Sequence, residues 1–189
     1  MTPTNHSRNL LIYLLKFLTI FAITYYGTLA VEGLATPENL YSPFVQHYLD
    51  YPSWLRSSLL HATKWVVGLL GHDAMIPDNF HVRFVGGRGV QLIYACLGVG
   101  VSCFWLAFVV ANKGTWLKKM YWVLGGILAI WIINVTRISL FLISVNNNTK
   151  MPLGMDNHDF FDVLAYVAIF GLMFLYDRSG RKVGRMENG

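Results

Sequence analysis

Four apolar runs, each long enough to cross a lipid bilayer as a helix, constrain this chain more than any other feature. A helix needs about 20 apolar residues to span the hydrocarbon core, where lipid-exposed loops and open sheet edges do not occur. The sequence predicts spanning helices at 10–31, 92–111, 120–145 and 158–176. Only 13% of the 189 residues are charged, against about 25% in soluble domains. We therefore expect one all-α integral membrane domain.

Basic residues gather in three clusters that predict the orientation of these spans. Cytoplasmic loops of membrane proteins carry an excess of Lys and Arg. One cluster lies at the start of the first span, one in the connector 112–119 and one in the tail 177–189. Four spans place all three clusters in the cytoplasm, whereas five spans leave one outside. The prediction is a multi-pass protein with both termini in the cytoplasm and the loops 32–91 and 146–157 outside.

The long outer loop is predicted to contain two further elements. Residues 54–72 have an apolar and a polar face at helical spacing, which is typical of an amphipathic helix lying on the membrane surface. The predicted apolar face consists of Leu55, Leu59, Ala62, Val66, Leu69 and Leu70. The alternative is a short additional span that lines the helix bundle. Residues 80–93 alternate in polarity around Gly86 and Gly87, which indicates a small extracytoplasmic β-hairpin with positive φ angles at both glycines.

One predicted span carries a charge at a depth where charges are costly. Arg137 lies in "WIINVTRISLFLI" (131–143), and Asn134 is one helical turn before it on the same face. An arginine at the centre of the bilayer costs about 3 to more than 10 kcal/mol, so such a residue indicates a functional site. The alternative is that Arg137 neutralises an aspartate and joins two helices.

Two further reactive side chains are predicted near the outer side of the membrane. Counted along ideal helices, Cys96 lies roughly 7 Å and Arg137 roughly 12 Å from the outer ends of their spans, and His158 begins the last span. We expect the three side chains to meet in one outward-facing cleft. If Cys96 and Cys103 share a helix, their Cα atoms lie roughly 10 Å apart, too far for a disulfide. Cys103 is interpreted as a packing residue.

This set of side chains matches the requirements of catalysis by a cysteine nucleophile. An apolar environment disfavours the reactive thiolate and a nearby positive charge favours it, so a membrane cysteine needs a cationic neighbour. His158 can act as base and then as acid to a leaving amine, while Arg137 can stabilise an oxyanion. Asp162, four residues after His158, is the candidate to orient its ring, with Asp159 and Asp156 as rivals. The chemistry calls for no cofactor and no metal.

The same residues resemble the exosortase/archaeosortase family in three places. "ACLG" (95–98) resembles the family's small-Cys-x-Gly motif, which makes Gly98 a supporting residue. "NVTRISLF" (134–141) resembles its Asn-x-x-Arg helix motif, and His158 resembles its single histidine. Leu97 is a departure, because many members carry a small polar residue there. The short chain is similar to the compact exosortases of Bacteroidota, such as the F-type.

The resemblance implies a sortase-like cysteine peptidase or transpeptidase in a bacterial inner membrane, with Cys96, Arg137 and His158 as catalytic residues. Such enzymes act at the outer face on secreted proteins that end in a tripartite signal: a short motif, a hydrophobic helix and a basic end. Cys96 would attack the peptide bond at the motif, and an acceptor would resolve the thioester. The edge of the 80–93 hairpin is a candidate to pair with an extended substrate.

Two other classes of function remain open from the residues alone. A non-catalytic membrane subunit would pair Arg137 with an acidic residue of a partner helix. A small transporter would use Arg137 in an ion path, although the spans hold few carboxylates for a proton relay. Beyond substrate proteins, membrane lipid is the expected partner. Nucleic acid is not expected, because no basic patch is interleaved with aromatic residues.

Overall fold

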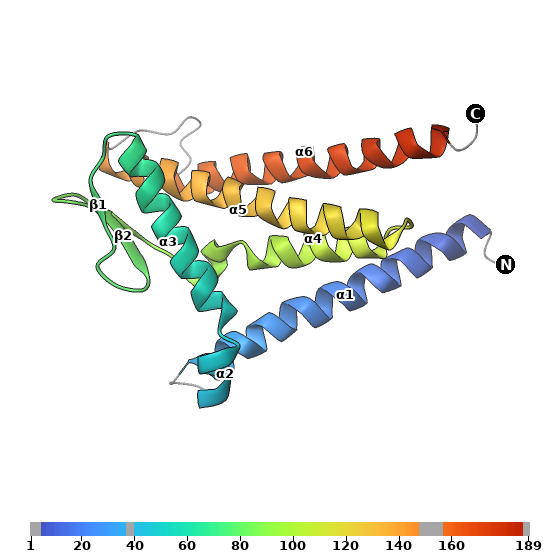
Figure 1. Cartoon of the computed structure of the whole chain (residues 1–189), viewed down its shortest axis with the longest axis horizontal. Helices are drawn as coiled ribbons and strands as arrows, with labels where there is room; N and C mark the ends of the chain where they lie inside the picture. Colours follow the sequence, from blue (N-terminus) through green and yellow to red (C-terminus); the bar gives the residue numbers. More distant parts are fainter. Residues whose placement is uncertain (1–4, 37–39, 148–156, 187–189) are drawn as a thin grey trace. The chain divides into compact units, whose positions relative to one another are not determined.

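The chain is mostly helical with a small β-sheet, and a computed structural model describes its backbone at residues 5–36, 40–147 and 157–186 (Figure 1). The chain divides into two compact units. Unit 1 comprises Met1–Ser58 and Leu92–Leu128, and unit 2 comprises Leu59–Gln91 and Ala129–Gly189. Each unit is described by itself below.

Within the described residues, three helices are long and apolar enough to cross a membrane. They are α1 (Asn5–Ala35), α5 (Trp116–Asn146) and α6 (Asn157–Met186). Each is longer than the span predicted for it, because polar residues at the ends of the apolar runs continue the helix. In particular, α6 extends through most of the basic tail, which the sequence pattern had separated from the last span.

The predicted span 92–111 differs from the observed structure. Residues Tyr94–Leu97 form a 3-10 turn, η1, and α4 (Val99–Ala111) begins only after it. Gly98 separates the two with a φ of 74°, a left-handed conformation that glycine adopts without strain. With 13 residues, α4 is about 20 Å long, shorter than the ~30 Å hydrocarbon core. The fourth crossing of the membrane therefore stays a prediction.

Aromatic side chains form the contacts that hold α4 in unit 1. Phe104 of α4 meets Phe17 and Phe21 of α1 edge-on, with ring centroids 5.2 and 6.5 Å apart. Trp105 is fully buried and donates a hydrogen bond from Nε1 to the Trp122 carbonyl of α5 at 3.0 Å. A Cβ on Gly126 would lie 1.9 Å from that nitrogen. Glycine at position 126 is thus what allows the indole to approach α5.

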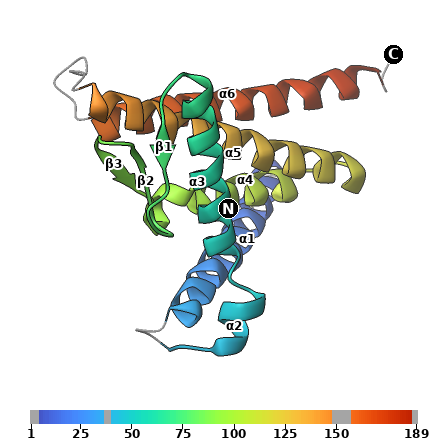
Figure 2. The same cartoon turned by 60° about the vertical axis from the view of Figure 1, so that its left-hand side comes forward.

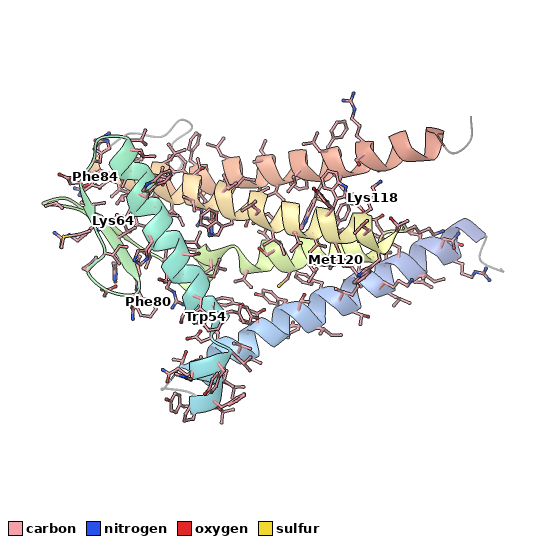
Figure 3. The ribbon with its side chains drawn as sticks, in the orientation of Figure 1. Trp54, Lys64, Phe80, Phe84, Lys118 and Met120 are labelled. Carbon is pink, nitrogen blue, oxygen red and sulfur yellow. The ribbon has the colours of Figure 1, made fainter. Side chains whose placement is uncertain are left out.

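The C-terminal end of α1 is tied to the elements that follow it. The Ser42 N–H, just before α2 (Pro43–Tyr48), donates to the Leu34 carbonyl at 2.8 Å. The first turns of α3 (Tyr51–Leu69) are tied to α1 by an ion pair between Arg56 and Glu32, with 3.0 Å between Nη2 and Oε1. Trp54 lies in this part of α3 (Figure 3). The segment after α1 therefore begins with two helices held beside the last turns of α1.

The helix predicted at 54–72 exists as α3, but its buried face differs from the predicted apolar face. The buried positions are Pro52, Arg56, Leu59, Leu60, Thr63 and Val67. Of the predicted face only Leu59 is buried, and Leu69 and Leu70 are exposed. The pattern of apolar residues is misleading here because Arg56 and Thr63 are buried although they are polar. Within the described residues, α3 is long enough, at 19 residues, but is not among the helices that are also apolar enough to cross a membrane. The choice between an interfacial helix and an additional crossing stays a prediction.

The predicted hairpin is confirmed and belongs to a three-stranded antiparallel sheet (Figure 2). Strand β2 (His81–Phe84) pairs with β3 (Gly89–Gln91) on one side and with β1 (Ala74–Met75) on the other. Of the two turn glycines, only Gly86 has a positive φ, of 73°. Gly87 is required for another reason: a Cβ there would lie 2.4 Å from Oδ1 of Asn146.

Asn146, at the C-terminal end of α5, anchors this turn within unit 2. Its Oδ1 accepts the Arg88 N–H at 2.7 Å, and its Nδ2 donates to the Arg88 carbonyl at 3.1 Å. The side-chain amide of Asn146 thus pairs with the main chain of Arg88 as a neighbouring strand would. The Arg88 guanidinium in turn donates to the Val145 carbonyl of α5 at 3.5 Å. Together these bonds fix the hairpin to the end of the helix that carries Arg137.

Candidate active site

Arg137 forms an ion pair with Asp162, which joins α5 to α6 inside unit 2. The contact is between Nη1 of Arg137 and Oδ1 of Asp162. Both side chains are largely buried, with exposed fractions of 16% and 26%. An uncompensated charge in this part of a span would be costly, so the pair explains how the chain tolerates its deep arginine. Asp162 was predicted to orient His158, whereas the observed contact agrees with the alternative that Arg137 neutralises an aspartate and joins two helices.

Two polar residues of α5 close to Arg137 in the sequence are buried. Asn134, one turn earlier, is 7% exposed, and Ser139 is 2% exposed. The Ser139 hydroxyl donates to the Val135 carbonyl of its own helix at 2.8 Å. The spacing of one turn puts Asn134 and Arg137 on the same side of α5.

His158 is the second residue of α6, as its predicted place at the head of the last span requires. Its side chain lies outside the described residues, and so does Asp156. Asp159 is exposed in the first turn of α6. The helical backbone puts Asp162 one turn beyond His158 on the same face. Which aspartate orients the ring stays a prediction.

Cys96 lies in the η1 turn and not inside a spanning helix, so the helical count behind its predicted depth does not apply and its depth stays a prediction. Its N–H donates to the Ile93 carbonyl at 2.9 Å, and the residue is partly exposed. It takes part in no disulfide. Gly98, two residues later, ends the turn and starts α4, where its carbonyl accepts the Ser102 N–H at 3.0 Å. The "ACLG" motif is therefore a sharp bend that presents its cysteine ahead of the helix.

The neighbours of Cys96 along the chain differ strongly in environment. Leu97, the departure from the expected motif, is 3% exposed. Cys103 is buried in α4, as its interpretation as a packing residue requires. Tyr94 was not singled out from the sequence, yet its hydroxyl is buried with no hydrogen-bond partner among the described residues. No sequence pattern signals such a group, because it arises only from packing.

Cys96 belongs to unit 1, while Arg137, Asp162 and the backbone of His158 belong to unit 2. Within unit 2 the structure brings Arg137 together with Asp162. The expectation that thiol, imidazole and guanidinium share one cleft stays a prediction.

A comparison with protein families bears on what these residues do. The family model described as "Transmembrane exosortase" matches residues 11–175, which is most of the chain. The chain belongs to the transmembrane exosortase family. The match includes Cys96, Arg137 and His158, together with most of α1, the first part of α6 and every described helix and strand between them. No curated protein and no solved structure gives a significant match.

Membership of the family supports the resemblance that the motifs suggested. As an exosortase, the chain is a membrane protein with several apolar helices. The exosortase match ends at residue 175, close to the end of the last predicted span. The basic residues after it are thus outside the region that defines the family.

Proposed function

We propose that this exosortase is a cysteine transpeptidase of a bacterial inner membrane. Its substrates would be secreted proteins with a C-terminal tripartite sorting signal, which it would cleave at the outer face and transfer to an acceptor. The observation that carries the proposal is the contrast between the two thiols. Cys103 is buried inside a helix, whereas Cys96 is partly exposed in a bend that ends at a left-handed glycine. The motif cysteine is therefore the thiol that a substrate can reach.

The proposed reaction has two steps. The thiolate of Cys96 attacks the carbonyl carbon of the scissile peptide bond, and the resulting oxyanion is stabilised by Arg137. The C–N bond then breaks, His158 gives a proton to the leaving amine, and the substrate acyl group remains as a thioester on Cys96. A nucleophile of the acceptor, or water, attacks the thioester and restores the thiol.

Asp162 has a supporting role in this proposal. Its ion pair fixes the orientation of the Arg137 guanidinium and neutralises its charge before an oxyanion forms. Fixed donors and charges that do not reorganise during the reaction are the most effective in stabilising a transition state. Asn134, buried one turn away, is proposed to hold the same region of α5 or to donate to the substrate.

The nucleophile is tested by expressing variants with a secreted protein of the same genome that ends in such a signal. Cys96→Ser should abolish processing, because a hydroxyl at this site is a far weaker nucleophile than a thiol. Cys103→Ser is the matched control and should process the substrate, because Cys103 is buried away from any reaction. Processing by Cys96→Ser at the wild-type rate would refute the proposal.

The ion pair removes the need for a partner protein in the competing hypothesis of a non-catalytic subunit. Asp162 supplies within one chain the carboxylate that this hypothesis assigned to a partner helix. The pair can then be purely structural, as a link between α5 and α6. Replacing a buried ion pair by apolar residues of similar volume is often neutral for stability, whereas removing one partner is strongly destabilising.

A double variant separates the structural from the catalytic role. Arg137→Met combined with Asp162→Leu should fold and insert, yet it should not process the substrate if Arg137 stabilises an oxyanion. Arg137→Lys should also lose activity, since a point charge does not replace the planar guanidinium. Normal processing by the double variant would show that the pair only links two helices.

A further inference from the structure

Strand β3 lies at the edge of the sheet, and its register determines which main-chain groups face outward. The Phe84 N–H donates to the Arg88 carbonyl, so these two residues form a hydrogen-bonded pair. Hydrogen-bonded and non-hydrogen-bonded pairs alternate along antiparallel strands. Val82 and Val90 are then hydrogen-bonded to each other. The N–H and carbonyl groups of Gly89 and Gln91 consequently point away from β2, toward the open edge.

The other side of β2 confirms this alternation. The Val85 N–H donates to the Asp73 carbonyl, so the odd-numbered residues of this segment face β1. Arg83 accordingly pairs with β1 and forms a non-hydrogen-bonded pair with Gly89. Such pairs bring the two chains closest together. This closeness explains the glycine, because a Cβ at position 89 would lie 2.8 Å from the Cβ of Arg83.

The β3 edge is short, with three residues, but it carries none of the side chains that usually protect an edge strand. Edges are normally protected by charged residues, prolines, bulges or very short strands. The opposite edge of the sheet is protected, since β1 has two residues and is followed by Pro77 and Asp78. The sequence "GVQLI" (89–93), which comprises β3 and the two residues after it, contains neither charge nor proline. Gly89 and Gln91 are exposed, and their outward groups have no main-chain partner among the described residues.

The edge of β3 is held in place. It is also close in sequence to the proposed nucleophile. Asn146 and the Val145 carbonyl fix Arg88, the residue before β3, to the end of α5. Gln91 precedes Cys96 by five residues (96 − 91). Five residues of extended chain reach at most about 18 Å. A substrate peptide in strand conformation covers the same length with a similar number of residues.

We propose that the open edge of β3 binds the substrate segment next to the scissile bond as an added β-strand. The inference rests on the proposed function. Main-chain hydrogen bonds with Gly89 and Gln91 would hold the segment extended, independent of most of its side chains. The site would select an unfolded, extended peptide and would exclude folded domains, which present no such strand. Sequence selectivity would then arise elsewhere in the protein.

Binding at the edge is tested by photo-crosslinking in the membrane, without relying on catalysis. A photoreactive residue replaces Gln91 in the full-length Cys96→Ser chain, which is expressed with the secreted protein used above. The proposal expects a crosslink to the substrate close to its short motif. The same residue at Met75, on the opposite edge, is the control and should give none. A crosslink between two copies of this chain, or equal yields at both positions, would overturn the proposal.

A second pair of variants tests the hydrogen bond itself in the active chain. Gln91→Pro removes an N–H that the sheet does not use, so the sheet should remain intact. Processing at low substrate concentration should fall at least tenfold, while alkylation of Cys96 proceeds at the wild-type rate. Gln91→Ala retains the N–H and should process normally. Wild-type processing by Gln91→Pro would contradict the proposal, whereas processing by Cys96→Ser would contradict only the proposed nucleophile.

Discussion

Arg137 shows how the free-energy cost of a charge inside a membrane helix is offset by a partner. A guanidinium inside a span needs a partner, and Asp162 provides one from the neighbouring helix. The sequence identified the charge and its neighbour Asn134, but not the partner. Asp162 was the candidate to orient His158, with Asp159 and Asp156 as rivals, and spacing along one helix cannot show which of the three faces another helix. The choice of partner depends on how α5 and α6 pack.

Gly125 and Gly126 are adjacent in α5 but differ in what surrounds them. A Cβ at Gly126 would overlap the Trp105 indole, whereas nothing lies within 4 Å of a Cβ at Gly125. We expect Gly126→Ala to lower the free energy of unfolding by about 1–3 kcal/mol, the usual cost of overpacking. Gly125→Ala should be neutral or slightly stabilising. Thermal denaturation in detergent measures both, and equal midpoints for the two variants would contradict the packing described for Trp105.

Among the elements, those with a strong local pattern were predicted and those that depend on distant contacts were not. The apolar runs predicted α1, α5 and α6, and alternation around two glycines predicted the β2–β3 hairpin. Strand β1 was missed because two residues carry no periodic signal. The bond between Arg88 and Asn146 joins residues 58 positions apart. No local pattern could reveal it, or the resulting requirement for glycine at position 87.

The anchor of the hairpin can be tested at Asn146. Asn146→Ala removes two hydrogen bonds to Arg88 and one to the Leu142 carbonyl. At about 1 kcal/mol for each bond, the sheet should open more often and its amide protons should exchange faster, while α5 itself remains protected. Asn147→Ala, at the next and exposed position, is the matched control. Unchanged exchange of β2 and β3 in Asn146→Ala would show that the anchor does not hold the sheet.

The start of α3 is expected to lie at the membrane interface. Its Trp54 is 59% exposed, and α3 is tied to the last turns of α1 through Arg56 and Glu32. Tryptophan is enriched where hydrocarbon meets the polar headgroups. In bilayers of brominated lipid, the tryptophan fluorescence of the wild type should be quenched. The quenched fraction should be smaller in Trp54→Phe. Equal quenching in both proteins would place Trp54 away from the lipid.

For the whole molecule, the number of crossings depends on α4. With three crossings, the basic connector 112–119 would follow α1 on the outer side, against the usual distribution of positive charge. With four, α4 and the non-helical residues before it cross together. Non-helical backbone is tolerated at membrane depth where it is buried in protein or lines a cavity. Cys96 lies in this non-helical segment, and the outward opening of its site stays a prediction.

The topology can be mapped with single cysteines in a Cys96→Ser, Cys103→Ser background. Tyr41→Cys should react with a membrane-impermeant maleimide added to intact cells from which any outer membrane has been stripped. Lys118→Cys should react only after the membrane is opened, because four crossings place it in the cytoplasm. Labelling of both positions from the outside would support three crossings and would remove the basis for an outward-facing site.

The most direct test of the central claim is to trap the covalent intermediate. Cells that express the wild type and its substrate are quenched in acid, and the peptide containing Cys96 is analysed by mass spectrometry. We predict an acyl group from the substrate on Cys96, released by hydroxylamine as a thioester would be and absent from Cys96→Ser. An acyl group on another residue would contradict the account. So would processing that leaves no adduct on Cys96 and that continues in Cys96→Ser.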